Sequence, residues 1–171
     1  VAAGTRATNM RQYIQIEMKQ EGWSCQCIRC REVKAHDFTA TPELKDLTIE
    51  TLGGTEHLLT FEKDNKLFSL LRLRLPELSL LTSHLPLFKE LSGCAIIREL
   101  HTYGKTVIHD QKLYTKTQHR GLGKLLMSEA EKIAKAAGYK KIAVISSIGT
   151  RNYYRKLGYE RNGLYMTKVL N

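Results

Sequence analysis

The segment QHRGLGKLL, Gln118–Leu126, places two glycines directly before an apolar, helix-forming run. Glycines at a helix N-terminus leave backbone N–H groups open to an anion, which the helix dipole also attracts. Gly138 follows the run as a C-cap would. The sequence therefore predicts a helix that begins at a phosphate-binding loop, the alternative being a simple turn. The apolar positions at helical spacing are Leu122, Leu125, Leu126, Ala130, Ile133, Ala134 and Ala137.

Spacing separates three kinds of phosphate-binding loop. A P-loop would need Gly at position 118 and Ser or Thr after Lys124, but the chain has Gln118 and Leu125. A dinucleotide-binding fingerprint that starts at Gly121 would need a third Gly where Leu126 stands. The shorter pattern Q/R-x-x-G-x-G/A fits, and it resembles the pyrophosphate loop of the Gcn5-related N-acetyltransferases, which bind acetyl-CoA. The resemblance implies these loop contacts to the cofactor: Gln118, His119, Arg120, Gly121, Leu122, Gly123 and Lys124.

The surrounding segments alternate between strand and helix patterns. Residues 47–76 predict two or three antiparallel strands, with KDNK at 63–66 as a hairpin turn. CAIIRELHTYG at 94–104 predicts the central strand, and KKIAVIS at 140–146 another buried strand. Residues 7–23 and 150–159 predict further helices, the first with Asn9 as its cap and Gly22 at its end. Residues 77–93 have helical spacing that Pro86 interrupts, so their structure stays ambiguous.

Composition indicates one well-packed domain with a basic surface. The chain has 171 residues, of which 42% are hydrophobic, and no apolar run approaches the ~20 residues of a membrane span. We therefore expect a cytoplasmic location and no membrane contact. Lys and Arg number 27 against 17 Asp and Glu, a net charge of +10. That excess favours polyanions such as RNA or the phosphates of CoA, although a solvated basic surface is the alternative.

Longer stretches carry a more specific resemblance. The segment from Gln118 to Lys168 closely resembles the acetyltransferase half of the catalytic subunit of Elongator. CQCIRCREV at 25–33, LLRLRLP at 70–76 and IRELHTYG at 97–104 match further signatures of that family in the same order. The resemblance implies a mixed α/β fold of the Gcn5-related N-acetyltransferase type, with a central, mostly antiparallel, twisted sheet flanked by helices.

The same resemblance predicts how the chain is divided. Residues 1–42 would form an N-terminal helix and a zinc-binding linker, and residues 43–171 the acetyltransferase domain. The family's radical-SAM half, with its CxxxCxxC motif for a 4Fe–4S cluster and S-adenosylmethionine, has no counterpart here. Because the first residue is Val1, we expect a fragment whose missing half adjoins the linker.

Three cysteines, Cys25, Cys27 and Cys30, form the pattern CxCxxC. Three thiolates this close can converge on one metal, whereas disulfide pairing would leave one of them unmatched. The spacing is not that of the family's iron–sulfur motif, and the resemblance also implies structural zinc. We predict His101 as the fourth ligand, with Cys94 and His36 as alternatives. The alternative role of His101 is structural, as a core imidazole held by hydrogen bonds on its strand.

The resemblance also assigns catalytic roles. Tyr154, in YRKLGY, matches the tyrosine that protonates the departing CoA thiolate, and Tyr153 is the next candidate, although both could be core aromatics. Glu99 is a candidate base or water-orienting carboxylate, or else the partner of Arg98 in a structural ion pair. The resemblance implies that backbone groups of the RELHTYG strand pair with the pantetheine arm. The predicted cofactor contacts outside the pyrophosphate loop are Glu99, Leu100, His101, Thr102, Asn152 and Tyr154.

The function implied by the resemblance is formation of the carboxymethyl group on the wobble uridine of tRNA anticodons, with possible Elongator-type partner subunits. Acetyl-CoA would bind here and be cleaved when tRNA is present, while the missing half would complete the chemistry. A protein lysine acetyltransferase of the histone type is one alternative, and a tRNA-binding module that only senses acetyl-CoA is another. Candidate tRNA contacts are Arg72, Arg74, Lys112, Lys116, Arg120, Lys140 and Lys141.

Overall fold

The structure is a computed structural model that describes residues 9–33, 41–77, 89–103 and 121–171. Its contacts divide the chain into two compact units, Val1–Glu32 and Val33–Asn171. The first unit contains two helices, α1 (Met10–Gln20) and α2 (Ile28–Arg31). No helix in the described ranges is long and apolar enough to cross a membrane.

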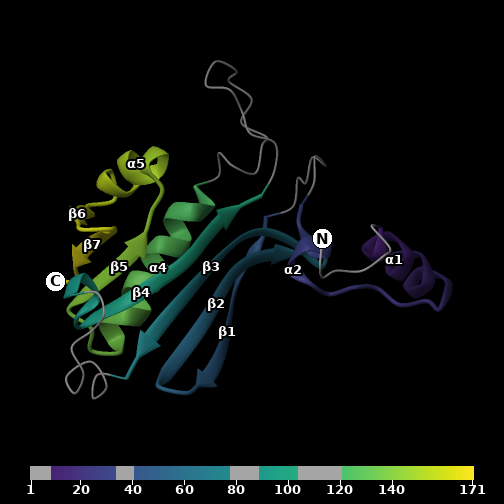
Figure 1. The fold of residues 1–171 in the computed structure, drawn as a ribbon, viewed down its shortest axis with the longest axis horizontal. Helices are drawn as coiled ribbons and strands as arrows, with labels where there is room; N and C mark the ends of the chain where they lie inside the picture. Colours follow the sequence, from purple (N-terminus) through teal and green to yellow (C-terminus); the bar gives the residue numbers. More distant parts are fainter. Residues whose placement is uncertain (1–8, 34–40, 78–88, 104–120) are drawn as a thin grey trace, which may run out of the picture. The chain divides into compact units, whose positions relative to one another are not determined.

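The second unit is built on one seven-stranded sheet with the order β1-β2-β3-β4-β5-β7-β6 (Figure 1). Among the described strands only the β4–β5 pair is parallel, and β4 occupies the middle position. The central strand and the mostly antiparallel sheet predicted from the sequence are therefore confirmed. The strands are β1 (Glu43–Thr51), β2 (Gly54–Lys63), β3 (Lys66–Pro76), β4 (Cys94–Thr102), β5 (Lys141–Ile145), β6 (Glu160–Asn162) and β7 (Tyr165–Val169).

The β2–β3 hairpin turns where the sequence predicts it. Asp64 and Asn65 have φ values of 47° and 57°, the left-handed conformation that a two-residue hairpin turn requires at both positions. Asn and Asp tolerate this conformation better than other residues with side chains. The turn lets β3 return alongside β2, with Lys63 opposite Lys66.

Helix α4 (Leu122–Ala136) packs on one face of the sheet, against β2, β3 and β4 (Figure 1). Its buried side chains meet the alternate residues Leu71, Leu73 and Leu75 of β3, while Arg72 and Arg74 point to the opposite face. Leu125, which the periodicity assigned to the apolar stripe, is 52% exposed. The prediction for Leu125 is wrong because the buried stripe of α4 is narrower and consists of Leu122, Leu126, Met127, Ala130 and Ala134.

The helix predicted over residues 150–159 is shorter in the structure than its pattern indicates. A 3₁₀ turn (Ile148–Thr150) leads into α5, which spans only Arg151–Arg155. Gly158, at φ 86°, then reverses the chain, and the Tyr159 N–H bonds to the Tyr154 carbonyl at 3.1 Å. This is the Schellman type of helix end. It brings the following residues back to the sheet as β6.

Candidate functional site

The candidate site begins where β4 and β5 stop pairing. Their parallel ladder runs from Cys94–Lys141 to Ile97–Val144 and ends there. Strand β4 continues to Thr102, which pairs with Ser69 of β3. Among the described residues, no other strand therefore covers the second edge of β4 from Glu99 to Thr102. The backbone groups on that edge are available to an extended ligand.

A β-bulge lies at the same point of β4. Arg72 pairs with Glu99 and Leu73 pairs with Ile97, so Arg98 is the extra residue. Bulges re-aim side chains and often lie next to active sites. Here the bulge coincides with the end of the β4–β5 ladder, and it sets the direction of the last residues of β4.

Gly121 and Gly123, which we call the glycine loop, lie at the start of α4. Gly121 is the N-cap, with φ 69° and ψ 15°, a conformation that costs glycine little. Its carbonyl accepts hydrogen bonds from the N–H groups of Lys124 at 2.9 Å and Leu125 at 3.1 Å. The N–H groups of Leu122 and Gly123 occupy the first turn, where a helix supplies no internal acceptors. Two N–H groups and the helix dipole thus face one point, as an anion site requires.

Three elements converge on Gly123. A Cβ atom at this position would lie 3.0 Å from Tyr153 Oη and 3.4 Å from Thr102 Oγ1. Gly123 belongs to α4, Tyr153 to α5 and Thr102 to the end of β4. Only a glycine fits between the two hydroxyl groups without displacing them. The start of α4, the free edge of β4 and α5 therefore form one site.

Tyr153 Oη is buried and has no hydrogen-bond partner in the described part of the chain. Burial, followed by the neighbouring Tyr154, raises the pKa of Tyr153 to about 12. Ser146 Oγ, directly after β5, is also buried without a partner there. Buried hydroxyl groups normally have partners, so these two indicate contacts that a ligand would complete. Sequence reasoning missed Ser146, since nothing in its neighbourhood distinguishes it.

Tyr154 has different surroundings. It is 7% exposed and belongs to the hydrophobic core. Its ring lies edge-on to Tyr153 at 5.2 Å and to Tyr159 at 6.0 Å between centroids. Burial raises the pKa of Tyr154. The ring of Tyr154 thus packs in the core, whereas the Tyr153 hydroxyl is the one beside Gly123; both catalytic assignments stay predictions.

The Glu99 carboxylate contacts residues other than the Arg98 considered from the sequence. Its carboxylate lies 3.2 Å from His101 Nε2 and 3.9 Å from Arg72 Nη1. Arg98 instead pairs with Glu56 of β2. The alternative of a structural Arg98–Glu99 ion pair is therefore wrong, because the Arg98 guanidinium is engaged by Glu56. Glu99 is 35% exposed and keeps access to solvent as a predicted base.

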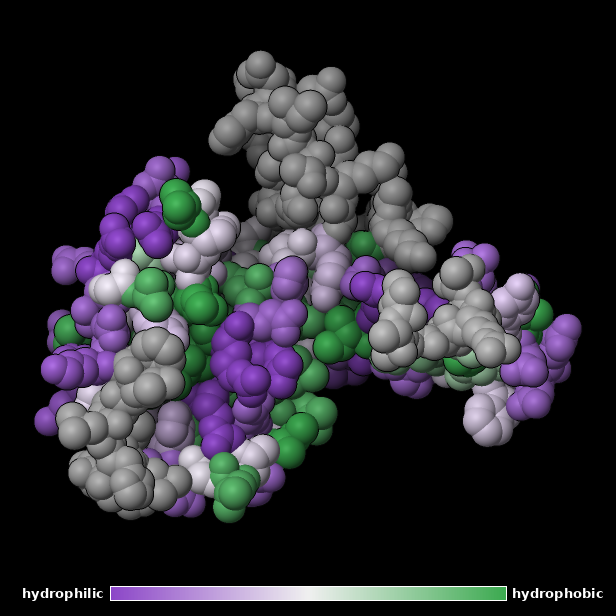
Figure 2. All heavy atoms as spheres, viewed as in Figure 1, coloured by the Kyte–Doolittle hydropathy of each residue, from purple (hydrophilic) through white to green (hydrophobic). Residues whose placement is uncertain are grey.

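Basic side chains gather on the sheet face opposite α4. Arg72, Arg74 and Arg98 surround Glu56, with Arg72 at 3.4 Å and Arg74 at 3.9 Å. Figure 2 shows hydrophilic atoms crossing the region of β2 to β4 on this face. Arg74 also donates hydrogen bonds to Thr51 Oγ1, to Leu52 O at 2.8 Å and to Gly54 O at 3.4 Å. These bonds give Arg74 a structural role that competes with the predicted tRNA contact.

The remaining predicted site residues are distributed as follows. Lys140 and Lys141 are exposed beyond the C-terminal end of α4. Asn152 Oδ1 accepts a hydrogen bond from Arg155 Nη1 at 2.6 Å, and Leu100 is partly buried against the core. Six predicted residues lie outside the described ranges: His36, Lys112, Lys116, Gln118, His119 and Arg120.

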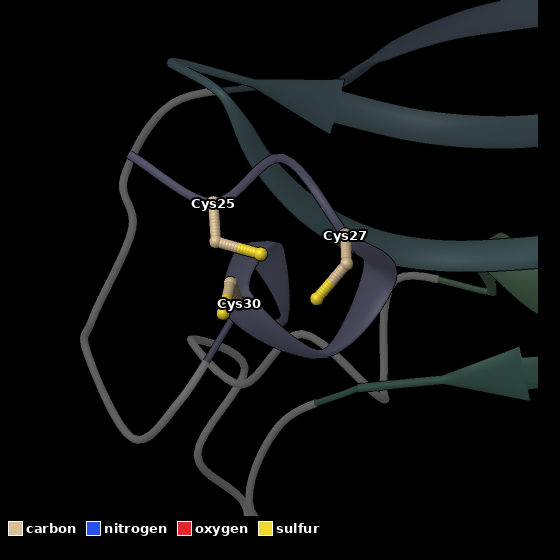
Figure 3. A group of neighbouring side chains, drawn as sticks. All are labelled: Cys25, Cys27 and Cys30. Atoms are coloured by element: carbon tan, nitrogen blue, oxygen red, sulfur yellow. The ribbon is translucent and has the colours of Figure 1, made fainter. Parts of the chain in front are cut away.

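The three cysteines of the first unit point toward one another (Figure 3). Their sulfur atoms all lie within 4.8 Å of one another. Zinc bonds to sulfur at about 2.3 Å, so sulfurs in a tetrahedral site lie roughly 3.8 Å apart. A modest contraction of the three side chains would therefore accommodate zinc. A hydrogen bond from the Cys30 backbone, helped by the side chains of Cys25 and Arg11, lowers the pKa of Cys27 to about 6.

The predicted fourth ligand belongs to the second unit. His101, at the end of β4, is 57% exposed and stacks on Tyr103 at 6.1 Å. Cys94, the alternative, is buried, and its thiol donates to the Glu90 carbonyl at 3.5 Å. The fourth ligand stays a prediction.

Comparisons with known proteins agree with this geometry. The sequence profile of the acetyltransferase (GNAT) family matches residues 39–159. The chain is 42% identical to Elongator complex protein 3 of Dictyostelium discoideum, covering 99% of this chain and 31% of the relative. It is 39% identical to the tRNA uridine(34) acetyltransferase of Methanocaldococcus jannaschii, covering 99% of this chain and 32% of the relative. The chain thus spans about a third of the length of these relatives.

A solved structure shares the fold across the chain. The archaeal Methanocaldococcus infernus Elp3, with an N-terminal deletion, superposes with a TM-score of 0.79 at 37% sequence identity. The match covers 99% of this chain and 41% of that one. Together with the family profile and the convergence of β4, α4 and α5, this identifies the fold expected from the sequence. The chain belongs to the acetyltransferase (GNAT) family.

Proposed function

We propose that this chain is the acetyl-CoA-dependent acyltransferase part of an enzyme that modifies the wobble uridine of tRNA. It binds acetyl-CoA at the start of α4 and cleaves the thioester when tRNA is bound. The names of the relatives at about 40% identity support the reaction class and the substrate. The net charge of +10 supports a polyanionic partner.

The cofactor is held by backbone groups and a few hydroxyls. The N–H groups of Leu122 and Gly123 bind the pyrophosphate at the helix N-terminus. The pantetheine arm lies along the free edge of β4, where its amides pair with the backbone as a neighbouring strand would. Ser146 Oγ and Tyr153 Oη, both buried and unpartnered in the described ranges, complete the polar contacts.

The observation that carries this proposal is the Tyr153 hydroxyl beside Gly123. In this step water, oriented by Glu99 as the predicted base, attacks the acyl carbon and forms a new C–O bond. The bond between the acyl carbon and sulfur then breaks, acetate is released, and the sulfur leaves with the electron pair as a thiolate. A hydroxyl group whose pKa is raised to about 12 keeps its proton at neutral pH. Tyr153, with Tyr154 as the other candidate, therefore donates a hydrogen bond that stabilises the developing negative charge.

The cysteines contribute to structure and not to this chemistry. In our proposal Cys25, Cys27 and Cys30 bind one zinc ion as thiolates, and zinc links the cysteine segment to α2. Elemental analysis of the purified chain tests this assignment. We expect one zinc per chain; iron in its place would contradict the proposal.

The decisive experiment measures CoA release by chromatography, with acetyl-CoA and either tRNA, a lysine peptide or no acceptor. We expect release only with tRNA, no acetylated peptide, and slower release for Tyr153→Phe at unchanged tRNA affinity. Tyr154→Phe tests the other candidate donor, and the change keeps the ring that packs in the core. Efficient peptide acetylation without a tRNA effect would establish the lysine acetyltransferase function. Tight acetyl-CoA binding with no turnover on either acceptor would establish a sensing module.

A further inference from the structure

Helix α1 carries two polar side chains that contact the cysteine sulfurs. Arg11 Nη2 donates to Cys30 Sγ at 3.0 Å and to Cys27 Sγ at 3.7 Å. Gln15 Nε2 donates to the same Cys30 Sγ at 3.4 Å. Cys30 thus accepts hydrogen bonds from two side chains. Arg and Gln supply only N–H donors at these atoms, so they match a sulfur that carries negative charge.

The two donors lie on one face of α1. Residues four apart on a helix are neighbours on its surface, so Arg11 and Gln15 reach the sulfurs together. None of the residues of α1 is buried, and the Asn9 side chain forms no capping hydrogen bond. The Arg11 and Gln15 contacts therefore connect α1 to the cysteine segment within this unit.

The positive charge of Arg11 would balance the net negative charge of a zinc ion bound by three thiolates. Three thiolates around one divalent zinc leave a net charge of −1, and a neutral imidazole as fourth ligand does not change it. A guanidinium next to two of the sulfurs brings the local sum to zero. Hydrogen bonds to thiolate ligands also fix their orientation and reduce their basicity.

We propose that Arg11 and Gln15 are positioning residues of the zinc site: they donate to the ligand sulfurs, and Arg11 supplies the counter-charge. This inference rests on the zinc site proposed above. Neither residue binds the metal itself. We expect metal binding and the ordering of α1 to be coupled, because the same donors, Arg11 and Gln15, join α1 to the sulfurs that would bind the metal.

The test is a zinc competition titration with a chromophoric chelator on the full 171-residue chain. Arg11→Met removes the charge and the donors, while Arg11→Lys keeps the charge. We expect Arg11→Met to weaken zinc binding by about 10–100-fold, the usual effect of losing a partner of a metal ligand, with Arg11→Lys closer to wild type. Gln15→Glu places a carboxylate beside Cys30 and should weaken binding more than Gln15→Met does.

Controls separate this role from general effects. Lys19→Met removes the same charge from an exposed position of α1 and should leave zinc affinity within twofold of wild type. Cobalt substitution reports whether the thiolate charge-transfer bands persist, and circular dichroism reports whether α1 loses helicity with the metal. Zinc affinity of Arg11→Met equal to that of Lys19→Met would overturn the inference.

The zinc site and the acyltransferase function can fail separately. Calorimetry of acetyl-CoA binding on every variant reports on the second unit, and we expect no change there. Wild-type protein that binds no zinc yet binds acetyl-CoA would overturn the metal site, and this inference with it, while leaving the cofactor site intact. Loss of acetyl-CoA binding in Arg11→Met alone would show a folding effect and also count against the inference.

Discussion

Tyr153 and Tyr154 are adjacent in one helical turn, yet their hydroxyl groups have different surroundings. The family resemblance of YRKLGY assigned the proton donor to Tyr154, because the sequence shows which residue matches a motif. It does not show which hydroxyl emerges beside Gly123, since that depends on how α5 packs. The structure brings Tyr153 Oη to the loop and leaves the Tyr154 ring against Tyr159.

Gly123→Ala should weaken acetyl-CoA binding by displacing the Tyr153 hydroxyl slightly, and Gly123→Glu should abolish it. Even a methyl group at this position would lie 3.0 Å from Tyr153 Oη and 3.4 Å from Thr102 Oγ1, and a longer side chain would also block the phosphate. Calorimetry measures the affinity. Gly149→Ala is the matched control, because a Cβ atom there meets nothing within 4 Å. Unchanged affinity in Gly123→Glu would remove the loop from the cofactor site.

Tyr153→Phe should reduce the alkaline sensitivity of the fold. The pKa of Tyr153 is raised from 10.0 to about 12 by burial and by Tyr154. Between these values the unfolded chain loses the phenolic proton and the folded chain keeps it, so the free energy of unfolding falls as pH rises. The variant lacks this contribution. Urea unfolding from about pH 9 to 12 measures the difference, with Tyr13→Phe on the exposed face of α1 as control.

At the scale of elements, periodicity and turn chemistry were sufficient for most of the sheet. Asp64 and Asn65 define the β2–β3 turn locally, and the helical spacing after Gly121 defines α4. The errors occurred where tertiary contacts decide. The short α5 reflects the return of the chain to β6, and the Arg98 bulge depends on pairing with β3. Neither contact has a local signal in the sequence.

Arg74→Met should destabilise the protein more than Arg72→Met. Arg74 is 17% exposed and bonds to two carbonyls and a hydroxyl of the β1–β2 connection; removing such bonds costs about 1–3 kcal/mol. Arg72 is 41% exposed and forms ion pairs with Glu56 and Glu99, for which we expect about 0–1 kcal/mol. Thermal unfolding compares them. An equal loss in both variants would contradict the structural role of Arg74.

At the scale of the whole molecule, the distribution of charge matters more than its sum. The net charge of +10 predicted a polyanionic partner, but composition could not show where the free cations lie. In the described ranges, Arg74 is engaged by backbone carbonyls, whereas Lys140 and Lys141 are exposed at the end of α4 opposite the glycine loop. The predicted tRNA contacts at Lys140 and Lys141 therefore lie away from the proposed cofactor site.

Replacing Lys140 and Lys141 with Glu should weaken tRNA binding while leaving acetyl-CoA affinity unchanged. Each phosphate contact releases counterions, so the log–log slope of affinity against salt should flatten by roughly 0.7 per single-strand contact removed. Filter binding at several salt concentrations measures it. The double variant with Glu at Lys19 and Lys156, both exposed, matches the change in charge. Equal weakening in both would show that only net charge matters.

The outer edge of the sheet has consequences for handling the protein. Strand β1 is nine residues long and exposed throughout, and Leu44, Leu47 and Ile49 are among its exposed side chains. Such an edge is a template on which another copy can add a strand, and charged residues such as Lys45 and Asp46 oppose that addition. The net charge of +10 also repels one copy from another, and high ionic strength screens that repulsion. Concentrated, salt-rich stocks are therefore the conditions in which chains would polymerise edge to edge, and dilute, low-salt buffers should keep them dispersed.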